Sequence, residues 1–172
     1  AQLIENEVRP TVEELAWKNQ LEIINLFNLF GDQWDSVMNY DAFMEPLSWF
    51  LTGMEKHSDE ENPALFRDGC AFFEAMRYHM SEMPTASVQC AMNELSNHDH
   101  SRFMTRTNRR VGRLASAGAK AAEEGISYGI FRQGVVMQMT WPGAPTIYYG
   151  DEAGVCGWTD PDSRRTYPWG GE

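Results

Sequence analysis

The chain has 172 residues, of which 42% are hydrophobic and 23% are charged, a balance typical of one soluble globular domain. Its formal net charge of −11 argues against nucleic acid and anionic membrane surfaces as partners, because both are negatively charged. No apolar run approaches the roughly 18 residues that a membrane-spanning helix needs. The N-terminal residues lack the basic and apolar stretches of a signal peptide, so we expect none in this chain.

The cysteines also limit the possible classes of protein. Cys70, Cys90 and Cys156 match no zinc-binding spacing, and their odd number disfavours a disulfide framework. We therefore expect buried, reduced thiols, as in a cytoplasmic protein.

Apolar periodicity and breaker residues predict an alternation of helices and strands. The first predicted helix covers residues 11–30, and its wide apolar face implies burial on two sides or contact with something absent from this chain. Further helices are predicted over residues 42–54, 65–80 and 126–141, and helical pieces over residues 101–122. Strands are predicted over residues 34–40, 88–95 and 145–149, and loops over residues 57–63 and 151–172.

The order of these elements predicts an α/β fold. Strands separated by helical stretches form parallel βαβ units. Three strands make a poor isolated parallel sheet, because both faces and both edges need cover, so the pattern suggests a piece of something larger. In the helix over residues 126–141, the apolar spacing predicts inward-facing side chains at Phe131, Val135, Val136 and Met139.

Each predicted strand ends in polar residues. These are Asn39 and Tyr40, then Asn97, His98 and Asp99, then Asp151 and Glu152. Ligands of parallel α/β folds bind at the carboxyl ends of strands, so the three ends are expected to face one mouth. The structural alternative for each end taken singly is a turn or a helix N-cap, which Asn and Asp favour.

His98 and His100 flank Asp99, so a metal site has to be considered. Adjacent residues on a strand point to opposite faces, so His98 and Asp99 do not easily share an ion, and the spacing of His57 and His79 suggests no ligand set. We predict no metal site and no cofactor.

The predicted C-terminal loop combines charged and aromatic side chains. Asp160 and Arg164 lie near Trp158, Tyr167 and Trp169. An aromatic ring stacks on the C–H face of a sugar, and charged groups hydrogen-bond its hydroxyls, so this set suits carbohydrate. The alternative is a loop held only by its own ion pair and aromatic contacts.

These runs resemble motifs of the alpha-amylase family of glycoside hydrolases, in particular its neopullulanase, cyclomaltodextrinase and maltogenic amylase group. Residues 31–40 resemble the sixth-strand region of that family, and residues 96–103 resemble its seventh-strand motif, a His-Asp pair followed by Arg-Phe. Residues 141–154 resemble its eighth-strand motif, and residues 160–169 resemble the loop that follows. The motifs stand in the family's order and cover most of the chain.

The resemblance implies a retaining mechanism on α-glucosidic bonds, with one carboxylate as nucleophile, one as acid and base, and a third that stabilises the transition state. Asp99 matches the third carboxylate. By the same resemblance, His98 hydrogen-bonds hydroxyls of the glycone, and Asp160 and Arg164 hold the next sugar outward.

Three further residues are expected in the substrate-binding region, where they look more like support for the barrel mouth than groups that touch the reacting atoms. They are Asn39, Tyr40 and Arg102.

The chain also departs from the family pattern. The family's nucleophilic Asp lies in a fourth-strand run Gly-x-Arg-x-Asp, and these 172 residues contain no such run. Its acid/base Glu ends the fifth strand, and the candidates here are Glu5 and Glu7, of which we take Glu7. In the family a Gly or Ala precedes that Glu, whereas Asn6 stands here.

The sequence therefore predicts a helix-rich, partial (β/α)8 TIM barrel containing about strands 6 to 8. Residues 1–30 are the N-terminal segment and helix, taken as the end of the fifth βα unit, and residues 31–172 form the C-terminal part of the barrel. The predicted function is a fragment of an alpha-glucan glycoside hydrolase, inactive alone and with alpha-glucan or maltooligosaccharide as its partner. The alternative is a non-catalytic half-barrel that binds sugar or self-associates through exposed strand edges as a homo-oligomer.

Overall fold

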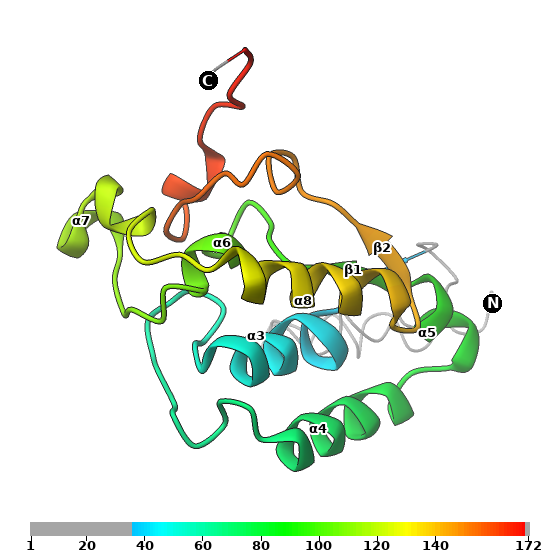
Figure 1. Ribbon diagram of the computed structural model, residues 1–172. Helices are drawn as coiled ribbons and strands as arrows, with labels where there is room; N and C mark the ends of the chain where they lie inside the picture. The colour runs from blue at the N-terminus through cyan, green and yellow to red at the C-terminus, as the bar shows by residue number, and fades with distance from the viewer. Residues whose placement is uncertain (1–35, 171–172) are drawn as a thin grey trace, which may run out of the picture.

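A computed structural model describes residues 36–170 of the chain. Several predictions lie outside these described residues. They are the helix over residues 11–30, the N-terminal segment 1–30 as a unit, and the acid/base candidates Glu5 and Glu7. Within them, the chain forms a small sheet covered by helices, followed by a long C-terminal loop (Figure 1).

The sheet is parallel, as the order of elements predicts. Strand β1 (Met92–Glu94) pairs in parallel with β2 (Ala144–Thr146), and Met92 lies opposite Ala144. On its other side, Met92 forms a parallel bridge with Met38. The three predicted strand segments therefore lie side by side in the order 38, β1, β2, although each pairs over fewer residues than the sequence predicts.

The helices of the described residues are mostly short. They are the π-helical turn η2 (Tyr40–Met44), α3 (Glu45–Thr52), α4 (Gly69–Ser81), α5 (Thr85–Cys90), α6 (Phe103–Arg106), α7 (Leu114–Ala117), the 3-10 turn η3 (Ala119–Ala122), α8 (Tyr128–Thr140) and the 3-10 turn η4 (Asp162–Arg164). None of them is long and apolar enough to cross a membrane.

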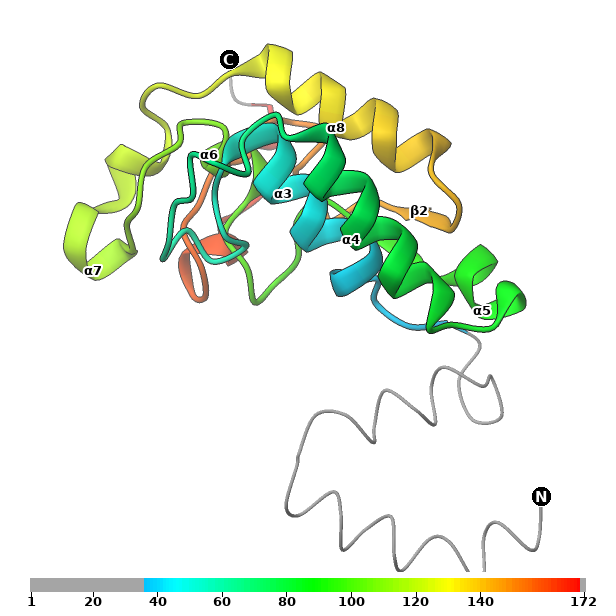
Figure 2. The ribbon, with the colours of Figure 1, turned by 90° about the horizontal axis from the view of Figure 1, so that it is seen from below.

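Three helices form a layer over the sheet. Figures 1 and 2 show α4, α3 and α8 lying side by side. The core between these helices, β1 and α6 is a cluster of apolar side chains, and burying a side chain of this size contributes about 1.5–3 kcal/mol. Its buried members are Phe43, Leu47, Leu51, Phe72, Met76, Leu95 and Phe103.

Local signals set the ends of the longer helices. Helix α3 ends at Gly53, whose φ of 71° lies in the left-handed region that glycine adopts freely. The Asp68 side chain accepts hydrogen bonds from the backbone N–H groups of Cys70 and Ala71, so α4 begins at Gly69 and not at residue 65. The Ser127 side chain caps α8 in the same way, by accepting a bond from the N–H of Ile130.

The predicted strand over residues 88–95 is wrong in its first half. Residues 85–90 form helix α5, which starts after Pro84, and the strand begins only at Met92. The N–H of Val88 donates to the carbonyl of Pro84, which closes a helical turn. Because Val88 is buried in the helix, its strand propensity is overridden by packing.

The predicted inner face of α8 is also wrong in part. Phe131 and Val135 pack against the core, but Val136 and Met139 are 60% and 47% exposed. Gly134 and Gln138 occupy the inner stripe instead. A Cβ at Gly134 would lie 2.5 Å from Cε1 of Phe103, and the Gln138 amide donates to the carbonyls of Asn93 and Thr146. A small residue and a polar residue therefore face the core, which apolar periodicity does not detect.

The prediction of helical pieces over residues 101–122 is confirmed by α6, α7 and η3. Trp158 packs against part of this helical segment. Its fully buried ring packs on Gly112, and its indole N–H donates to the carbonyl of Gly118 over 3.0 Å. The cysteines are free thiols, but only Cys156 is buried and Cys70 is exposed, which corrects the expectation that all three are buried.

Candidate active site

The predicted strand ends meet above the carboxyl edge of the sheet. His98 and Asp99 follow β1, and Asp160 and Arg164 belong to the C-terminal loop that follows β2. Figure 1 shows this loop, coloured orange to red, returning over the green segment that follows β1. The fold thus brings together residues about 60 positions apart in the sequence.

Four charged or polar side chains form a half-exposed cluster. The Nη2 atom of Arg164 lies 3.7 Å from Oδ1 of Asp99, and its Nε atom lies 2.5 Å from Oδ1 of Asp160. The Nε2 atom of His98 lies 3.4 Å from the same Asp99 oxygen. All four side chains are about half exposed, between 48% and 51%, so they remain open to a ligand.

A buried amide fixes the turn that carries Asp99, which we call the 97–101 turn. Oδ1 of Asn97 accepts from the N–H groups of Asp99 and His100, both over 3.0 Å. Its Nδ2 donates to the hydroxyl of Tyr40 over 3.0 Å and to Oε2 of Glu94 over 3.2 Å. Asn97 therefore joins the first strand segment, β1 and the turn. Sequence reasoning assigned it no such part, although Asn is a common turn residue.

The C-terminal loop holds the same turn by its backbone carbonyls. The Asp99 carbonyl accepts from the Thr159 hydroxyl over 2.5 Å and from the N–H of Asp160 over 3.3 Å. The Ser163 hydroxyl donates to the His98 carbonyl over 2.9 Å. The backbone of His98 and Asp99 is therefore fixed by the loop, while their side chains stay exposed.

Arg102 lies under this loop and is completely buried. Its Nε donates to the Ser163 carbonyl over 2.9 Å, and its Nη1 donates to the Tyr149 carbonyl over 2.6 Å and to Oδ1 of Asp151 over 3.1 Å. The guanidinium also lies 4.1 Å from the ring centre of Tyr148. Burial raises the pKa of Asp151 to about 6 even though Arg102 favours its charged form. Arg102 thus supports the loop from within.

Asn39 and Tyr40 differ in their access to the cluster. Asn39 is buried, and its amide donates to Oδ1 of Asn93 over 2.9 Å. Tyr40 is half-buried beside Asn97, and burial, followed by the nearby charges of Glu94 and Asp99, raises its pKa to about 12. Burial also raises the pKa of Glu94, since the Asn97 donor only partly opposes it. Tyr40 therefore remains a neutral phenol at physiological pH.

His98 and His100 point into different surroundings. His98 is exposed, whereas His100 is buried, with its Nδ1 atom 3.1 Å from the Met44 sulfur and its ring edge-on to Tyr40 at 4.8 Å between centres. Burial and then the charge of Arg106 lower the pKa of His100 to about 3. Among residues 36–170, no three His, Cys, Asp or Glu side chains are arranged to hold a metal ion.

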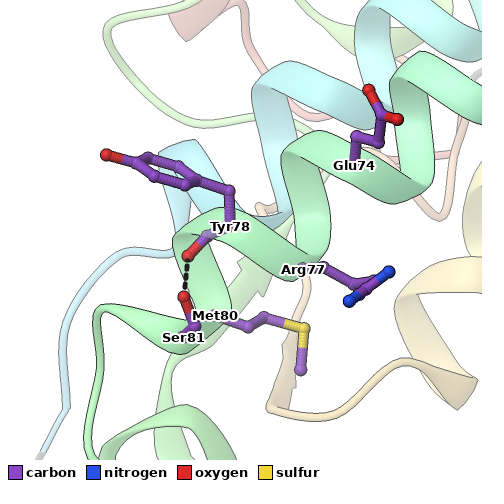
Figure 3. Close-up of a pocket in the computed structure, with 5 residues that line it drawn as sticks. All are labelled: Glu74, Arg77, Tyr78, Met80 and Ser81. Atoms are coloured by element: carbon purple, nitrogen blue, oxygen red, sulfur yellow. Dashed lines mark hydrogen bonds between the residues drawn. The ribbon is translucent and has the colours of Figure 1, made fainter.

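A separate surface hollow lies along α4. Figure 3 shows its lining residues, and the Ser81 hydroxyl donates there to the Tyr78 carbonyl over 2.7 Å. The lining is Glu74, Arg77, Tyr78, Met80 and Ser81. None of the predicted site residues takes part, so this hollow is distinct from the Asp99 cluster.

Comparison with known proteins identifies the class. The family model for the catalytic domain of alpha amylase matches residues 11–167. The chain belongs to the alpha-amylase family. The catalytic domain of this family is a (β/α)8 barrel, and a small parallel sheet covered by helices agrees with that fold class.

The chain is similar to a neopullulanase and to a cyclomaltodextrinase. It is 38% identical over 141 residues to neopullulanase 2 of Thermoactinomyces vulgaris, covering 82% of this chain and 19% of that protein. It is 33% identical over 142 residues to a cyclomaltodextrinase of Thermoanaerobacter pseudethanolicus, covering 82% of this chain and 20% of that protein. The chain therefore spans about a fifth of the length of these relatives.

The chain is also similar to part of several solved enzyme structures. The debranching enzyme from Nostoc punctiforme is 28% identical and superimposes with a TM-score of 0.60, covering 84% of this chain and 27% of that chain. A cyclic maltosyl-maltose hydrolase from Arthrobacter globiformis is 30% identical with a TM-score of 0.51, covering 82% of this chain and 26% of that chain. The described fold therefore corresponds to about a quarter of such an enzyme chain.

Proposed function

We propose that this chain supplies the transition-state-stabilising carboxylate, Asp99, of a retaining glycoside hydrolase that acts on α-1,4 or α-1,6 glucosidic bonds. One observation carries the proposal. The alpha-amylase match extends over residues 11–167, and within it Asp99, His98, Asp160 and Arg164 gather on one half-exposed surface.

The geometry suits a carboxylate that grips a sugar. The backbone of Asp99 is held on both sides, through its N–H by Asn97 and through its carbonyl by Thr159, so little ordering remains for substrate to bring about. Its carboxylate faces solvent and accepts hydrogen bonds from hydroxyls. Such bonds strengthen as the sugar ring gains positive charge, which stabilises the transition state more than the ground state.

The other members of the cluster are assigned to binding. His98 donates to glycone hydroxyls from the same side as Asp99. Arg164 contacts both Asp99 and Asp160, which supports a role between the reacting sugar and the next one outward. Asp160 and Arg164 hold that second sugar. Arg102, Asn39 and Tyr40 belong to the same region as supports, because their contacts run to the backbone and side chains beneath the cluster.

We further propose that residues 31–172 form about strands 6 to 8 of the barrel, and that the nucleophile comes from sequence outside these 172 residues. The proposal rests on the absence of a Gly-x-Arg-x-Asp run in these 172 residues and on the fraction of each relative that is covered. Glu7 is kept as the candidate acid/base. The chain alone is then expected to be inactive, because loss of one member of a catalytic set costs several orders of magnitude.

The experiment compares two proteins on maltotriose, pullulan and a chromogenic maltoside. One is the protein translated from the complete reading frame that carries these residues, and the other is the 172-residue chain. We expect only the protein from the complete reading frame to hydrolyse these substrates. Proton NMR of its products should show that the anomeric configuration is retained. Turnover by the 172-residue chain would contradict the proposal that it is an inactive fragment. Products of inverted configuration would contradict the retaining mechanism.

A second candidate function is a half-barrel that self-associates. It is favoured by large apolar side chains exposed on α8 and after β2, at Val136, Met139 and Ile147, which are 60%, 47% and 54% exposed. Within the described residues β2 pairs with β1 alone, so its outer edge is open to a second copy. Sedimentation velocity of the 172-residue chain tests this self-association. A chain that stays monomeric at all concentrations, with or without bound maltotriose, would rule it out.

A further inference from the structure

The loop between α3 and α4 reaches the turn that carries Asp99. We call its residues 55–58 the 55–58 loop. The N–H of Ser101 donates to the Lys56 carbonyl over 3.1 Å, and the Ser101 hydroxyl donates to the same oxygen over 3.0 Å. Because that hydroxyl has used its proton, the Ser58 hydroxyl donates to Ser101 over 2.8 Å. The 55–58 loop is therefore fixed against the far end of the 97–101 turn.

His57 of this loop completes a second link to Asp99. Its Nδ1 atom lies 2.8 Å from the Thr159 hydroxyl oxygen, and the same hydroxyl lies 2.5 Å from the Asp99 carbonyl. A hydroxyl has one proton and a carbonyl only accepts, so the Thr159 proton goes to Asp99. His57 must then donate through Nδ1–H. The direction of the chain is His57 to Thr159 to Asp99, and it fixes the histidine tautomer.

The ring of His57 also packs against the turn. It lies edge-on to the ring of His100, with 4.6 Å between centres, and His100 packs on Tyr40 from another side. The N–H of His57 donates to Oε2 of Glu55 over 2.7 Å, which fixes the backbone that carries the ring. His57 thus contacts His100, the residue after Asp99, and Thr159, whose hydroxyl donates to the Asp99 carbonyl.

We propose that His57 is a positioning residue for Asp99, acting through the Thr159 hydroxyl. This rests on the proposed function, since Asp99 must be the transition-state carboxylate for its position to affect rate. A hydroxyl that accepts a bond from Nδ1–H is a stronger donor to the Asp99 carbonyl, because chains of hydrogen bonds polarise one another. Loss of His57 is therefore expected to weaken the binding of Asp99 to the distorted sugar of the transition state. The half-exposed surface that binds the undistorted substrate is left unchanged.

The test uses the protein from the complete reading frame with His57→Ala, His57→Asn and Thr159→Val. Asn carries an N–H donor near the position of Nδ1, whereas Ala carries none. We expect His57→Ala and Thr159→Val each to lower kcat about tenfold with KM changed less than about threefold, as for loss of an interaction made in the transition state. His57→Asn is expected to recover most of the loss. His57→Ala added to Thr159→Val is expected to cost little more, because the shared bond is already gone.

His79 gives the matched control, since its Nδ1 bonds Glu82 at 3.2 Å on α4 and it makes no contact with the turn. His79→Ala is expected to keep wild-type kcat. A His57→Ala protein with normal kcat and only a lowered Tm would overturn the proposal, as would a His57→Asn protein no better than His57→Ala. Proton–nitrogen NMR of the wild type is independent of activity and must show His57 protonated at Nδ1. If the wild type does not hydrolyse glucans, the proposed function fails, and an unprotonated Nδ1 separately refutes the link to Thr159.

Discussion

Replacing Arg102 by Met tests the buried support of the loop. Arg102 has no exposed surface, and it holds the carbonyls of Ser163 and Tyr149, the carboxylate of Asp151 and the face of Tyr148. Met fills a similar volume but donates no hydrogen bond. The substitution therefore removes every polar contact of the side chain while leaving much of the packing.

The size of the effect follows from those contacts. Two bonds to backbone carbonyls contribute about 1 kcal/mol each, and the guanidinium over the aromatic ring contributes about 1–2 kcal/mol. Removing Arg102 also leaves Asp151 buried without its cation. The total cost of removing one partner of a buried pair is about 3–5 kcal/mol, a figure that already contains the lost hydrogen bonds and is not added to them. We expect Arg102→Met to lower the free energy of unfolding by about 4 kcal/mol at pH 7.

The pH dependence separates the ion pair from the other contacts. Burial holds the pKa of Asp151 at about 6 in the folded protein, above its value of about 4 in the unfolded chain. The folded state therefore binds more protons between about pH 4 and pH 6, so this group's contribution to stability falls as pH rises through that window. Without Arg102 the folded pKa is higher still, and the gap between wild type and Arg102→Met must widen from pH 5 to pH 7.5.

The assay is urea unfolding at pH 5 and at pH 7.5, monitored by tryptophan fluorescence. Adding Asp151→Asn to Arg102→Met is expected to recover about 1–2 kcal/mol at pH 7.5, because the uncompensated charge is gone. Arg110 is the control, since its pair with Glu124 is half exposed and Arg110→Met should cost less than about 1 kcal/mol. A loss in Arg102→Met as small as that, or a gap that does not change with pH, would refute the reasoning.

Two further predictions concern stability. The pKa of His100 is lowered to about 3 in the folded protein, below its unfolded value of about 6.5. Its contribution to the stability of the folded protein is therefore present above pH 6.5 and is lost as the pH falls. Because Gln does not titrate, His100→Gln should remove about 3 kcal/mol of this loss at pH 4, as measured in acid-unfolding curves. Gly143 has a φ of 134°, and a Cβ there would lie 2.6 Å from Nδ2 of Asn93 and 2.7 Å from the Ala91 carbonyl oxygen, so Gly143→Ala should cost about 2–3 kcal/mol in urea unfolding. Gly69→Ala, where a Cβ meets nothing within 4 Å, should cost nothing, and equal losses at the two glycines would contradict the steric argument.

The sequence predicted the parts of the fold that depend on local patterns. The parallel order of the strands and the helical pieces of residues 101–122 follow from periodicity and breakers, and the structure has both. The inner face of α8 was missed because Gly134 and Gln138 face the core for reasons of space and hydrogen bonding. Helix α5 was missed because Val88 reads as a strand residue in any local window.

The candidate site divides in the same way. His98, Asp99, Asp160 and Arg164 could be named from motif order, and the fold brings these four together. The residues that hold them could not be named, because their contacts join distant segments. The Thr159 hydroxyl bonds a carbonyl 60 residues away, and its second partner, His57, lies 102 residues from it. Only the folded chain shows such pairs.

The most direct test of the proposed function is the turnover of Asp99→Asn in the protein from the complete reading frame, assayed on maltotriose. Asn keeps the size of the side chain and removes its charge, so binding of the ground state should persist. We predict that kcat falls at least about a thousandfold while KM changes little. Glu124→Gln, in which an equally half-exposed carboxylate paired with an arginine is neutralised, should retain full activity. Asp99→Asn with wild-type kcat would contradict the assignment of Asp99 as the transition-state carboxylate.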